Sequence, residues 1–207
     1  MPKKKIFAFK DKKVIVFDLD GTIVRLAADW HSLKEVLNYR YSEHFQDDCQ
    51  FKSISACLSE IVEKGDEAEL QHNFDIIKQY ELDNIEKNEP IEETIYFINN
   101  TKLFGVKKGT KLAILSLNTR QTIKKSLKLA GISGKFDFIL GREDVRSWKP
   151  EPEGLLRIME HYKVNKEDMI YFGDLEKDLA TGANAGIEAH YIDDLINLVK
   201  SCKNELI

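Results

Sequence analysis

The chain has 207 residues, of which 43% are hydrophobic and 32% charged, so it can bury a sizeable core and is not a disordered polyelectrolyte. Its formal net charge of -4 argues against a cationic protein that coats nucleic acid, and no apolar run approaches the roughly 20 residues of a membrane-spanning helix. The lysines after Met1 resemble the start of a secretory signal, but the charged residues 11–13 interrupt the apolar segment it would need. The absence of CxxC spacing predicts reduced thiols in a cytoplasmic protein for Cys49, Cys57 and Cys202.

Short runs of β-branched and aromatic residues predict the strands. The first covers 14–17 and shows no polar alternation, which suits a strand buried on both faces of a parallel sheet. Similar runs follow at 111–116, 136–140, 169–173 and, more weakly, 189–192. Helical patterns separate these strands and predict helices over 119–130, 152–163, 176–184 and 194–204. This alternation indicates an α/β protein with a Rossmann-like parallel sheet and right-handed crossovers.

The stretch from 27 to 87 departs from this alternation. It has no convincing strand run, and apolar residues recur at helical spacing over 29–46, 51–64 and 67–80. Pro90 is expected to open a further helix that leads back to the strand at 111. We therefore predict a core formed by 1–26 and 88–207 and a helical insertion over 27–87. The aromatic residues expected to form the core of this insertion are Trp30, Tyr39, Phe45, Phe51 and Phe74.

Polar residues follow the ends of four predicted strands, where an open parallel sheet binds its ligands. They are Asp18 with Asp20, Ser116, Lys149 in the turn of residues 148–150, and Asp174 with Asp178. Four carboxylates around one pocket would repel one another unless a cation lay between them. Clustered aspartates suit a hard divalent ion, so the sequence predicts Mg²⁺ as a cofactor.

Four short motifs occur in order along the core. Residues 18–22 read DLDGT, Ser116 ends the second core strand, Lys149 precedes a proline, and residues 173–178 read GDLEKD. This order resembles the haloacid dehalogenase superfamily, whose first motif is DxDGT and whose fourth is GDxxxD. By position and helicity, the insertion resembles the helical cap of the phosphoglycolate phosphatase-like and β-phosphoglucomutase-like branch. The resemblance implies a Rossmann-like core with an inserted cap.

The two aspartates of the first motif suit different roles in phosphoryl transfer. The Asp18 carboxylate is the candidate nucleophile, since it can attack phosphorus and form an aspartyl-phosphate. Asp20 would protonate the leaving oxygen and then activate water. Within the family, dehalogenase-like members carry Tyr at this position and phosphonatase-like members Ala, and neither provides that acid. Asp20 therefore favours phosphate-ester chemistry.

The remaining motif residues would bind the phosphate and the ion. The Ser116 hydroxyl would donate to a phosphoryl oxygen, and Asn118 is a further candidate, although relatives often place Asn directly after this Ser or Thr, where this chain has Leu117. Lys149 would bring positive charge to Asp18 and to the phosphoryl group. The family's coordination implies an ion held by the Asp18 carboxylate, the Asp20 main-chain carbonyl and Asp174.

The fourth motif opens a predicted helix, on which residues four apart share a face. Asp178 is therefore expected on the same face as Asp174, where it would hold a metal-bound water or Lys149. Glu176 and Lys177 are expected to point to solvent.

The predicted function is that of a Mg²⁺-dependent phosphatase acting on a small phosphorylated metabolite, with no nucleic acid or membrane as partner. A phosphomutase would use the same residues, and a non-catalytic binding protein with this fold is a further alternative. The substrate and the oligomeric state stay open. Basic residues of the cap region that are candidates for contacting distal groups of a substrate are Arg25, His31, Lys34, Arg40 and Lys52.

Overall fold

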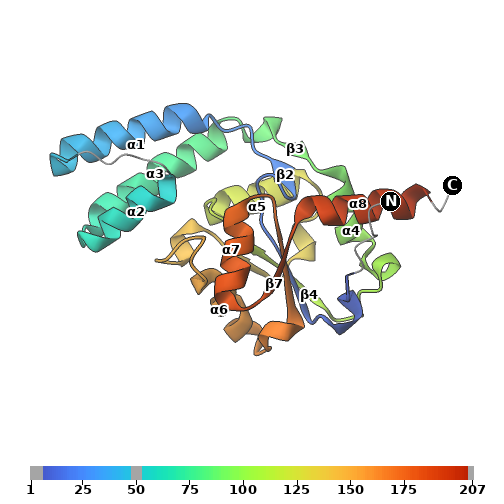
Figure 1. Ribbon diagram of the computed structural model, residues 1–207. Coiled ribbons are helices and arrows are strands. Elements are labelled where there is room, and N and C mark those ends of the chain that lie inside the picture. The colour runs from blue at the N-terminus through green and yellow to red at the C-terminus, as the bar shows by residue number, and fades with distance from the viewer. Residues whose placement is uncertain (1–6, 48–52, 205–207) are drawn as a thin grey trace.

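The computed structural model describes residues 7–47 and 53–204 (Figure 1). Its centre is a five-stranded parallel sheet with the strand order β5-β4-β1-β6-β7. The strands are β1 (Val14–Phe17), β4 (Lys111–Leu115), β5 (Phe138–Leu140), β6 (Met169–Gly173) and β7 (Glu188–Tyr191). Five predicted strands are thus present within two residues of their expected ends. The α/β fold predicted from the sequence is confirmed.

Both faces of the sheet are covered by helices. Ile15 and Phe17 of β1 belong to one apolar cluster, and Val14 and Val16 belong to another, and all four are fully buried. Fully burying such a side chain contributes about 1.5–3 kcal/mol relative to exposure, which explains why this strand shows no polar alternation. The helices of the core are α4 (Glu92–Asn99), α5 (Arg120–Leu129), α6 (Glu153–Tyr162), α7 (Glu176–Ala185) and α8 (Ile192–Asn204).

The two clusters show which helices cover which face. Side chains of α4, α5 and α8 pack into the cluster with Phe17, whereas α6 supplies Leu155 and Ile158 to the cluster with Val16. Short 3₁₀ helices complete the described chain: η1 (Phe9–Asp11), η2 (Ile85–Lys87), η3 (Thr101–Phe104), η4 (Ser133–Lys135), η5 (Arg142–Asp144) and η6 (Lys166–Asp168). No helix in the described part of the chain is long and apolar enough to cross a membrane.

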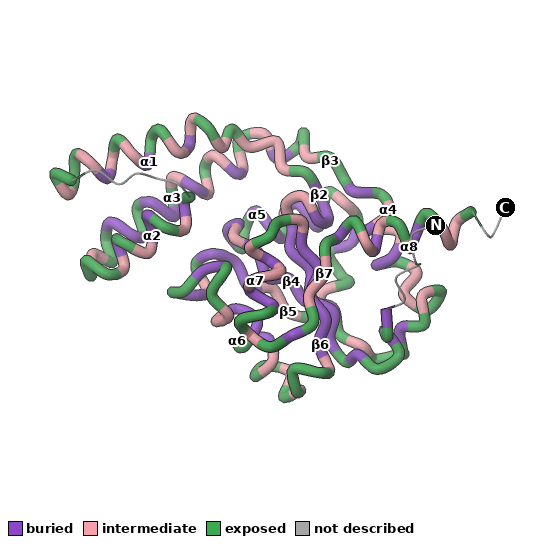
Figure 2. Tube along the Cα trace, in the orientation of Figure 1, coloured by how far each residue is buried: buried purple, intermediate pink, exposed green. Residues whose placement is uncertain are grey.

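Three helices form a separate unit beside the sheet (Figure 1). They are α1 (Trp30–Phe45), α2 (Ile54–Glu63) and α3 (Glu67–Asp83), and we call them the cap. The cap has its own apolar cluster, which the core loops enter through Val145 and Trp148. The burial pattern in Figure 2 differs accordingly, since β6 is buried at every position and α1 alternates between buried and exposed positions.

The chain enters and leaves the cap through a short antiparallel pair that the sequence did not predict. Strand β2 (Val24–Arg25) pairs with β3 (Glu89–Pro90), with Val24 opposite Pro90. The prediction that Pro90 opens a helix was therefore wrong, and α4 begins at Glu92 instead. A proline is tolerated in a two-stranded edge pair, and two residues are too few to show an alternating pattern.

The predicted core of the cap is confirmed only in part. Phe74 is buried and Phe45 packs partly buried against the same cluster, as does Trp30. Tyr39 is 70% exposed, so its assignment to the core was wrong. Tyr39 lies on the side of α1 opposite the buried Leu33 and Leu37, and its ring is therefore exposed to solvent. Phe51, like Cys49, lies outside the described residues, whereas Cys57 is buried in the cluster.

Candidate active site

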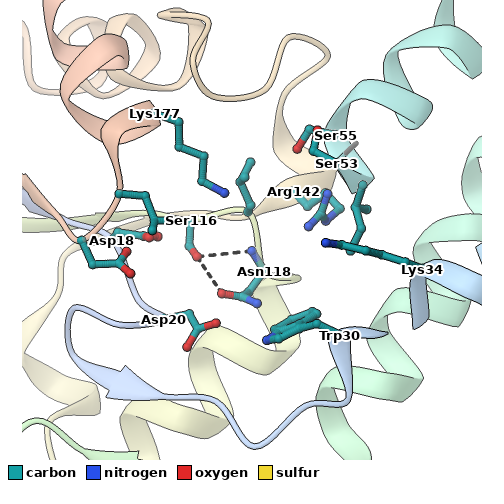
Figure 3. Close-up of a pocket in the computed structure, with 14 residues that line it drawn as sticks. Asp18, Asp20, Trp30, Lys34, Ser53, Ser55, Ser116, Asn118, Arg142 and Lys177 are labelled. Atoms are coloured by element: carbon teal, nitrogen blue, oxygen red, sulfur yellow. Dashed lines mark hydrogen bonds between the residues drawn. The ribbon is translucent and has the colours of Figure 1, made fainter. Parts of the chain in front are cut away.

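A pocket of about 320 Å³ lies between the carboxyl ends of the central strands and the cap (Figure 3). From the core it is lined by side chains that follow β1, β4, β5 and β6, and from the cap by α1 and the start of α2. The residues around it are Asp18, Asp20, Trp30, Lys34, Ser53, Ile54, Ser55, Ser116, Leu117, Asn118, Arg142, Asp174, Leu175 and Lys177. The pocket therefore combines residues of three predicted motifs with residues of the cap.

Three carboxylates meet at the core end of the pocket. One oxygen of each of Asp18, Asp174 and Asp178 lies within 4.8 Å of the others. Gly21 makes the approach possible: its φ is +72°, and a Cβ added there would lie 2.2 Å from Asp174 Oδ2. A Cβ at Gly173 would likewise lie 2.3 Å from the carboxyl carbon of Asp178. Gly21 of the first motif and Gly173 of the fourth are therefore both needed for the acidic residues to come together.

Lys149 is buried among these carboxylates. Its Nζ lies 3.1 Å from Asp18 Oδ1 and 2.6 Å from Asp178 Oδ1, and it donates a hydrogen bond to the Tyr171 hydroxyl. Burial acts to lower the pKa of Lys149, but the charges of Asp18 and Asp178 outweigh it and raise that pKa. The lysine is therefore charged at neutral pH. The expected position of Asp178 next to Lys149 is present in the structure.

Tyr171 is a member of this group that the sequence analysis missed. Its hydroxyl donates to Asp178 Oδ1 over 2.7 Å, and the whole side chain is buried. A signal was present, since a tyrosine in an otherwise apolar buried strand needs a partner for its hydroxyl. Together with Lys149 it fixes the position of Asp178.

Among the described residues, the three carboxylates of the acidic group share one ion-paired lysine, so their negative charge is not fully balanced. Asp18 Oδ1 has no hydrogen-bond partner among the described residues apart from the Lys149 ion pair, and the buried Asp174 Oδ1 has none. Burial raises the pKa of Asp18 despite the nearby Lys149. Burial, followed by the charges of Asp18 and Asp178, raises the pKa of Asp174 to about 7. Unpaired buried carboxylate oxygens at this spacing fit a divalent cation.

Asp20 stands apart from this acidic group. Its Oδ1 accepts a hydrogen bond from Leu26 N at 2.9 Å, and its side chain faces the pocket (Figure 3). Burial raises the pKa of Asp20 to about 6, although the bond from Leu26 acts in the opposite direction. The carboxyl group is thus placed to exchange a proton near neutral pH while Asp18 and Asp174 face each other.

Ser116 and Asn118 form one hydrogen-bonded unit after β4 (Figure 3). Ser116 Oγ donates to Asn118 Oδ1 at 2.9 Å, and Asn118 N donates back to Ser116 Oγ at 3.2 Å. Both side chains are buried and line the pocket, and their binding of phosphate stays a prediction. The extra residue Leu117 therefore does not prevent Asn118 from reaching the site.

A cap residue holds this unit from the other side. Glu81, in the last turn of α3, accepts from Asn118 Nδ2 at 2.9 Å and from both the backbone and the hydroxyl of Thr119. Its side chain is buried at the boundary between cap and core. No sequence pattern indicates this role, because Glu81 lies among other charged residues of a helix and its contact depends on how that helix docks on the core.

The basic residues of the pocket differ from those expected. Lys177, predicted to face solvent, lines the pocket, and burial lowers its pKa. Its position in the first turn of α7 turns it toward the cap, whereas Glu176 beside it is exposed as expected. Arg142, which the sequence analysis did not single out, is buried in the pocket wall. Arg142 belongs to none of the four motifs, so no sequence pattern indicated its place in the pocket.

Of the four cap-region candidates for substrate contact that the structure describes, only Lys34 lines the pocket. Arg25 is exposed in β2, His31 is exposed beside Glu35, and Arg40 forms an ion pair with Glu69. Lys52 lies outside the described residues.

The protein has a parallel α/β core, and acidic residues and a lysine lie at the ends of its strands, beneath a helical cap. This arrangement is typical of an enzyme whose active site lies at the carboxyl edge of its sheet. The family model described as haloacid dehalogenase-like hydrolase matches residues 15–192. The chain belongs to this family. The predicted family, and the prediction that the protein is an enzyme, are confirmed.

Relatives with curated names and solved structures agree with this assignment. Pyrophosphatase PpaX from Bacillus mycoides is 27% identical over 177 residues, which cover 83% of this chain and 79% of the relative. A structure described as a predicted phosphoglycolate phosphatase from Haemophilus somnus superposes with a TM-score of 0.58 at 17% identity, covering 92% of each chain. A HAD-superfamily hydrolase of subfamily IA from Geobacter sulfurreducens gives a TM-score of 0.55 at 16% identity, covering 91% of this chain and 97% of that one. The two solved structures show that the chain shares their fold, and the family model shows that it is a haloacid dehalogenase-like hydrolase.

Proposed function

We propose that this protein is a Mg²⁺-dependent phosphatase that hydrolyses a small phosphate monoester through an aspartyl-phosphate on Asp18. The observation that carries the proposal is the acidic group of Asp18, Asp174 and Asp178 around the buried Lys149. A pocket of about 320 Å³ suits a small metabolite. The cysteine pattern supports a cytoplasmic location.

In this proposal the cation is held by the carboxylates of Asp18 and Asp174 and by the main-chain carbonyl of Asp20. The two carboxylate oxygens without hydrogen-bond partners, one on each of Asp18 and Asp174, support this choice of ligands. Oxygen-only ligands favour a hard ion such as Mg²⁺. When bound, the ion would supply the positive charge that lets an ionised Asp18 approach a phosphate group.

The first step forms the covalent intermediate. An Asp18 oxygen attacks phosphorus, a new P–O bond forms, and the bond from phosphorus to the ester oxygen breaks. Asp20 gives its proton to that leaving oxygen, a role supported by its pKa of about 6. Lys149 and the Ser116 hydroxyl hold the phosphoryl oxygens. To do so the hydroxyl turns its proton from Asn118 Oδ1 to the phosphoryl group, while the N–H of Asn118 still donates to Ser116 Oγ and holds it in place.

The second step releases phosphate. Asp20, now ionised, takes a proton from a water molecule whose oxygen attacks phosphorus. The bond between phosphorus and Asp18 breaks, which returns the Asp18 carboxylate and leaves inorganic phosphate. Lys149 stays charged throughout, since its two carboxylate neighbours raise its pKa.

We assign residues 27–87 to the cap domain and 1–26 with 88–207 to the core. The β2–β3 pair closes the base of this cap, and Glu81 contacts the core at the site itself. Closure of the cap over the pocket would keep bulk water out during the attack by Asp18, and opening would release the product.

The test is an assay of p-nitrophenyl phosphate hydrolysis with Mg²⁺ and with EDTA. Wild-type protein should release phosphate only with the ion, and Asp18→Asn should remove turnover because an amide is not a nucleophile toward phosphorus. Asp75→Asn, a change of an exposed carboxylate on α3, is the matched control and should keep full activity. Turnover by Asp18→Asn equal to that of wild type would show that another group attacks.

A further inference from the structure

Two backbone hydrogen bonds hold Arg142 in the pocket wall. It is the first residue of η5, its N–H donates to Asn118 O at 2.9 Å, and its carbonyl accepts from Trp148 Nε1 at 2.8 Å. The residue is only 3% exposed, and it lines the same pocket as Asp18 and Ser116. Its side chain therefore starts from a fixed main-chain position beside the phosphate-binding unit.

The guanidinium group of Arg142 lacks the partners that a buried charge normally has. Nε and Nη1 are buried and have no hydrogen-bond partner within the described part of the chain. The two carboxylates whose charges act on Arg142 accept hydrogen bonds from other groups, since Glu81 accepts from Asn118 and Thr119 and Glu143 accepts from Arg120 N. A buried charge without a hydrogen-bonded counterion is unfavourable, so its retention in a pocket wall indicates a ligand.

The charge persists at neutral pH. Burial lowers the pKa of Arg142 to about 10, and the charges of Glu81 and Glu143 act in the opposite direction. A guanidinium group presents N–H donors in a planar fork that matches the two oxygens of a carboxylate or a phosphate.

The cap contributes to the same end of the pocket. Lys34 of α1 and the hydroxyls of Ser53 and Ser55 at the start of α2 lie on the side of Arg142, and Asp18 lies on the other side (Figure 3). Lys34 forms no ion pair with a described residue, and Ser53 is the N-cap of the ten-residue helix α2. The backbone N–H groups of such a helix start favour negative charge.

We propose that Arg142, together with Lys34, binds a second anionic group of the substrate, so that the enzyme selects small phosphate compounds that also carry a carboxylate or another phosphate. This inference rests on the proposed function, because it assumes that the transferred phosphoryl group lies against Asp18, Ser116 and Lys149. Arg142 then acts as a specificity residue that touches the part of the substrate that does not react.

The experiment compares three substrates in the presence of Mg²⁺. Phosphoglycolate carries a carboxylate, inorganic pyrophosphate carries a second phosphate, and 2-hydroxyethyl phosphate has the size of the first without its second charge. Wild-type protein should prefer at least one of the two compounds that carry a second anionic group over 2-hydroxyethyl phosphate, as measured by kcat/KM. The preferred one identifies which anion the site takes.

Arg142→Ala should lower kcat/KM for the preferred substrate by roughly 10- to 100-fold, the effect of losing hydrogen bonds to a charged group. The loss should lie mainly in KM, and hydrolysis of 2-hydroxyethyl phosphate should change less than about twofold. Arg142→Lys should recover part of the preference. The surface variant Arg157→Ala, half exposed beside Glu153, is the control and should match wild type on all substrates.

Two outcomes would overturn the inference. One is equal hydrolysis of the three substrates by the wild-type enzyme, and the other is an equal loss on all three in Arg142→Ala. Binding is read separately by quenching of tryptophan fluorescence in Asp18→Asn, since Trp30 lines the pocket. Saturable quenching by phosphoglycolate or pyrophosphate that Arg142→Ala weakens would support the anion site even if the proposed reaction were wrong. Quenching that is unchanged by Arg142→Ala would contradict it.

Discussion

At the core end of the pocket the functional side chains stand directly after buried strands, and at the cap end they come from helices and from a loop. Asp18 follows β1 and Asp174 follows β6, two strands that are fully buried at every described position. Lys34 and Ser53, by contrast, belong to α1 and to the start of α2, where only one side of each helix is buried. The acidic end is therefore anchored on strands that are buried along their whole length.

This difference explains how the two ends divide the work. Asp18 and Asp174 need positions within a few ångströms of each other, which the neighbouring strands β1 and β6 in register provide, and Asp178 joins them from the first turn of α7. Contacts with the distal part of a substrate tolerate more variation, and a helical unit joined to the core by a short strand pair can supply them. We therefore expect changes at the core end to affect the chemical steps and changes at the cap end to affect the choice of substrate.

The largest effect that tests this division concerns Asp20. Asp20→Asn removes the proton donor but leaves the acidic group intact, so kcat should fall about 10²- to 10⁴-fold. The fall should be greater for an alkyl phosphate than for p-nitrophenyl phosphate, because p-nitrophenolate leaves without a proton. Steady-state assays with both substrates measure this, and an equal fall for the two would argue against Asp20 as the acid.

The next effect concerns the ammonium group at the centre of the core end. Lys149→Met leaves the buried Asp18 and Asp178 without their cation, so the free energy of unfolding in metal-free buffer should fall by about 3–5 kcal/mol. Added Mg²⁺ should restore part of it, since an ion would replace some of the lost charge. Urea unfolding with and without the ion checks both statements.

The control for that measurement is Lys124→Met, an exposed position on α5, which should change stability by less than about 0.5 kcal/mol. Equal unfolding midpoints for Lys149→Met and the control would mean that the buried lysine does not balance the acidic group.

A smaller effect is expected where cap and core meet. Glu81→Gln places an amide N–H2 group where a carboxylate accepts bonds from Asn118 and Thr119, leaving one buried donor without an acceptor. Stability should fall by about 1–3 kcal/mol, and kcat should fall several-fold because Asn118 orients Ser116. Glu86→Gln, an exposed residue of η2 that pairs with Lys125, is the control. Wild-type stability and kcat in Glu81→Gln would contradict a role for this contact.

The core end of the site was largely predictable, and the cap end was not. Strand ends are visible in the sequence as apolar runs, and in a parallel sheet they meet at one edge, so Asp18, Ser116 and Asp174 could be assigned to one site. Lys177 and Arg142 depend on which side of a short helix faces the pocket. That is set by tertiary docking, which local patterns do not encode.

The same limit applies to the links between the two parts. Glu81 reaches the core only because α3 ends at the boundary, and Pro90 pairs with Val24 across a separation of more than sixty residues. Neither contact leaves a periodic pattern in the sequence. The prediction of Tyr39 as a core residue was wrong for a related reason, since aromatic character alone does not say which side of α1 is buried.

The smallest expected effect is a pH dependence of stability that arises in the cap. Asp66 caps α3, and the hydrogen bond from Glu69 N, followed by the one with His44, lowers the pKa of Asp66 below its ordinary 3.8. A pKa lowered by folding means stabilisation that is present above the ordinary value and is lost as the pH falls through the folded value. Asp66→Asn should therefore be less stable than wild type at pH 6, and the gap should close toward pH 3. Urea unfolding at both pH values checks this, and a gap of constant size would contradict it.

The most direct test of the central claim is a crystal structure with Mg²⁺ and beryllium fluoride, which mimics a phosphoryl group on a carboxylate. The account predicts the fluoride adduct bonded to an Asp18 oxygen, an ion between Asp18 and Asp174, and Lys149 and Ser116 against the fluorines. An ion bound away from these aspartates, or an Asp18 carboxylate turned away from the mimic, would contradict it.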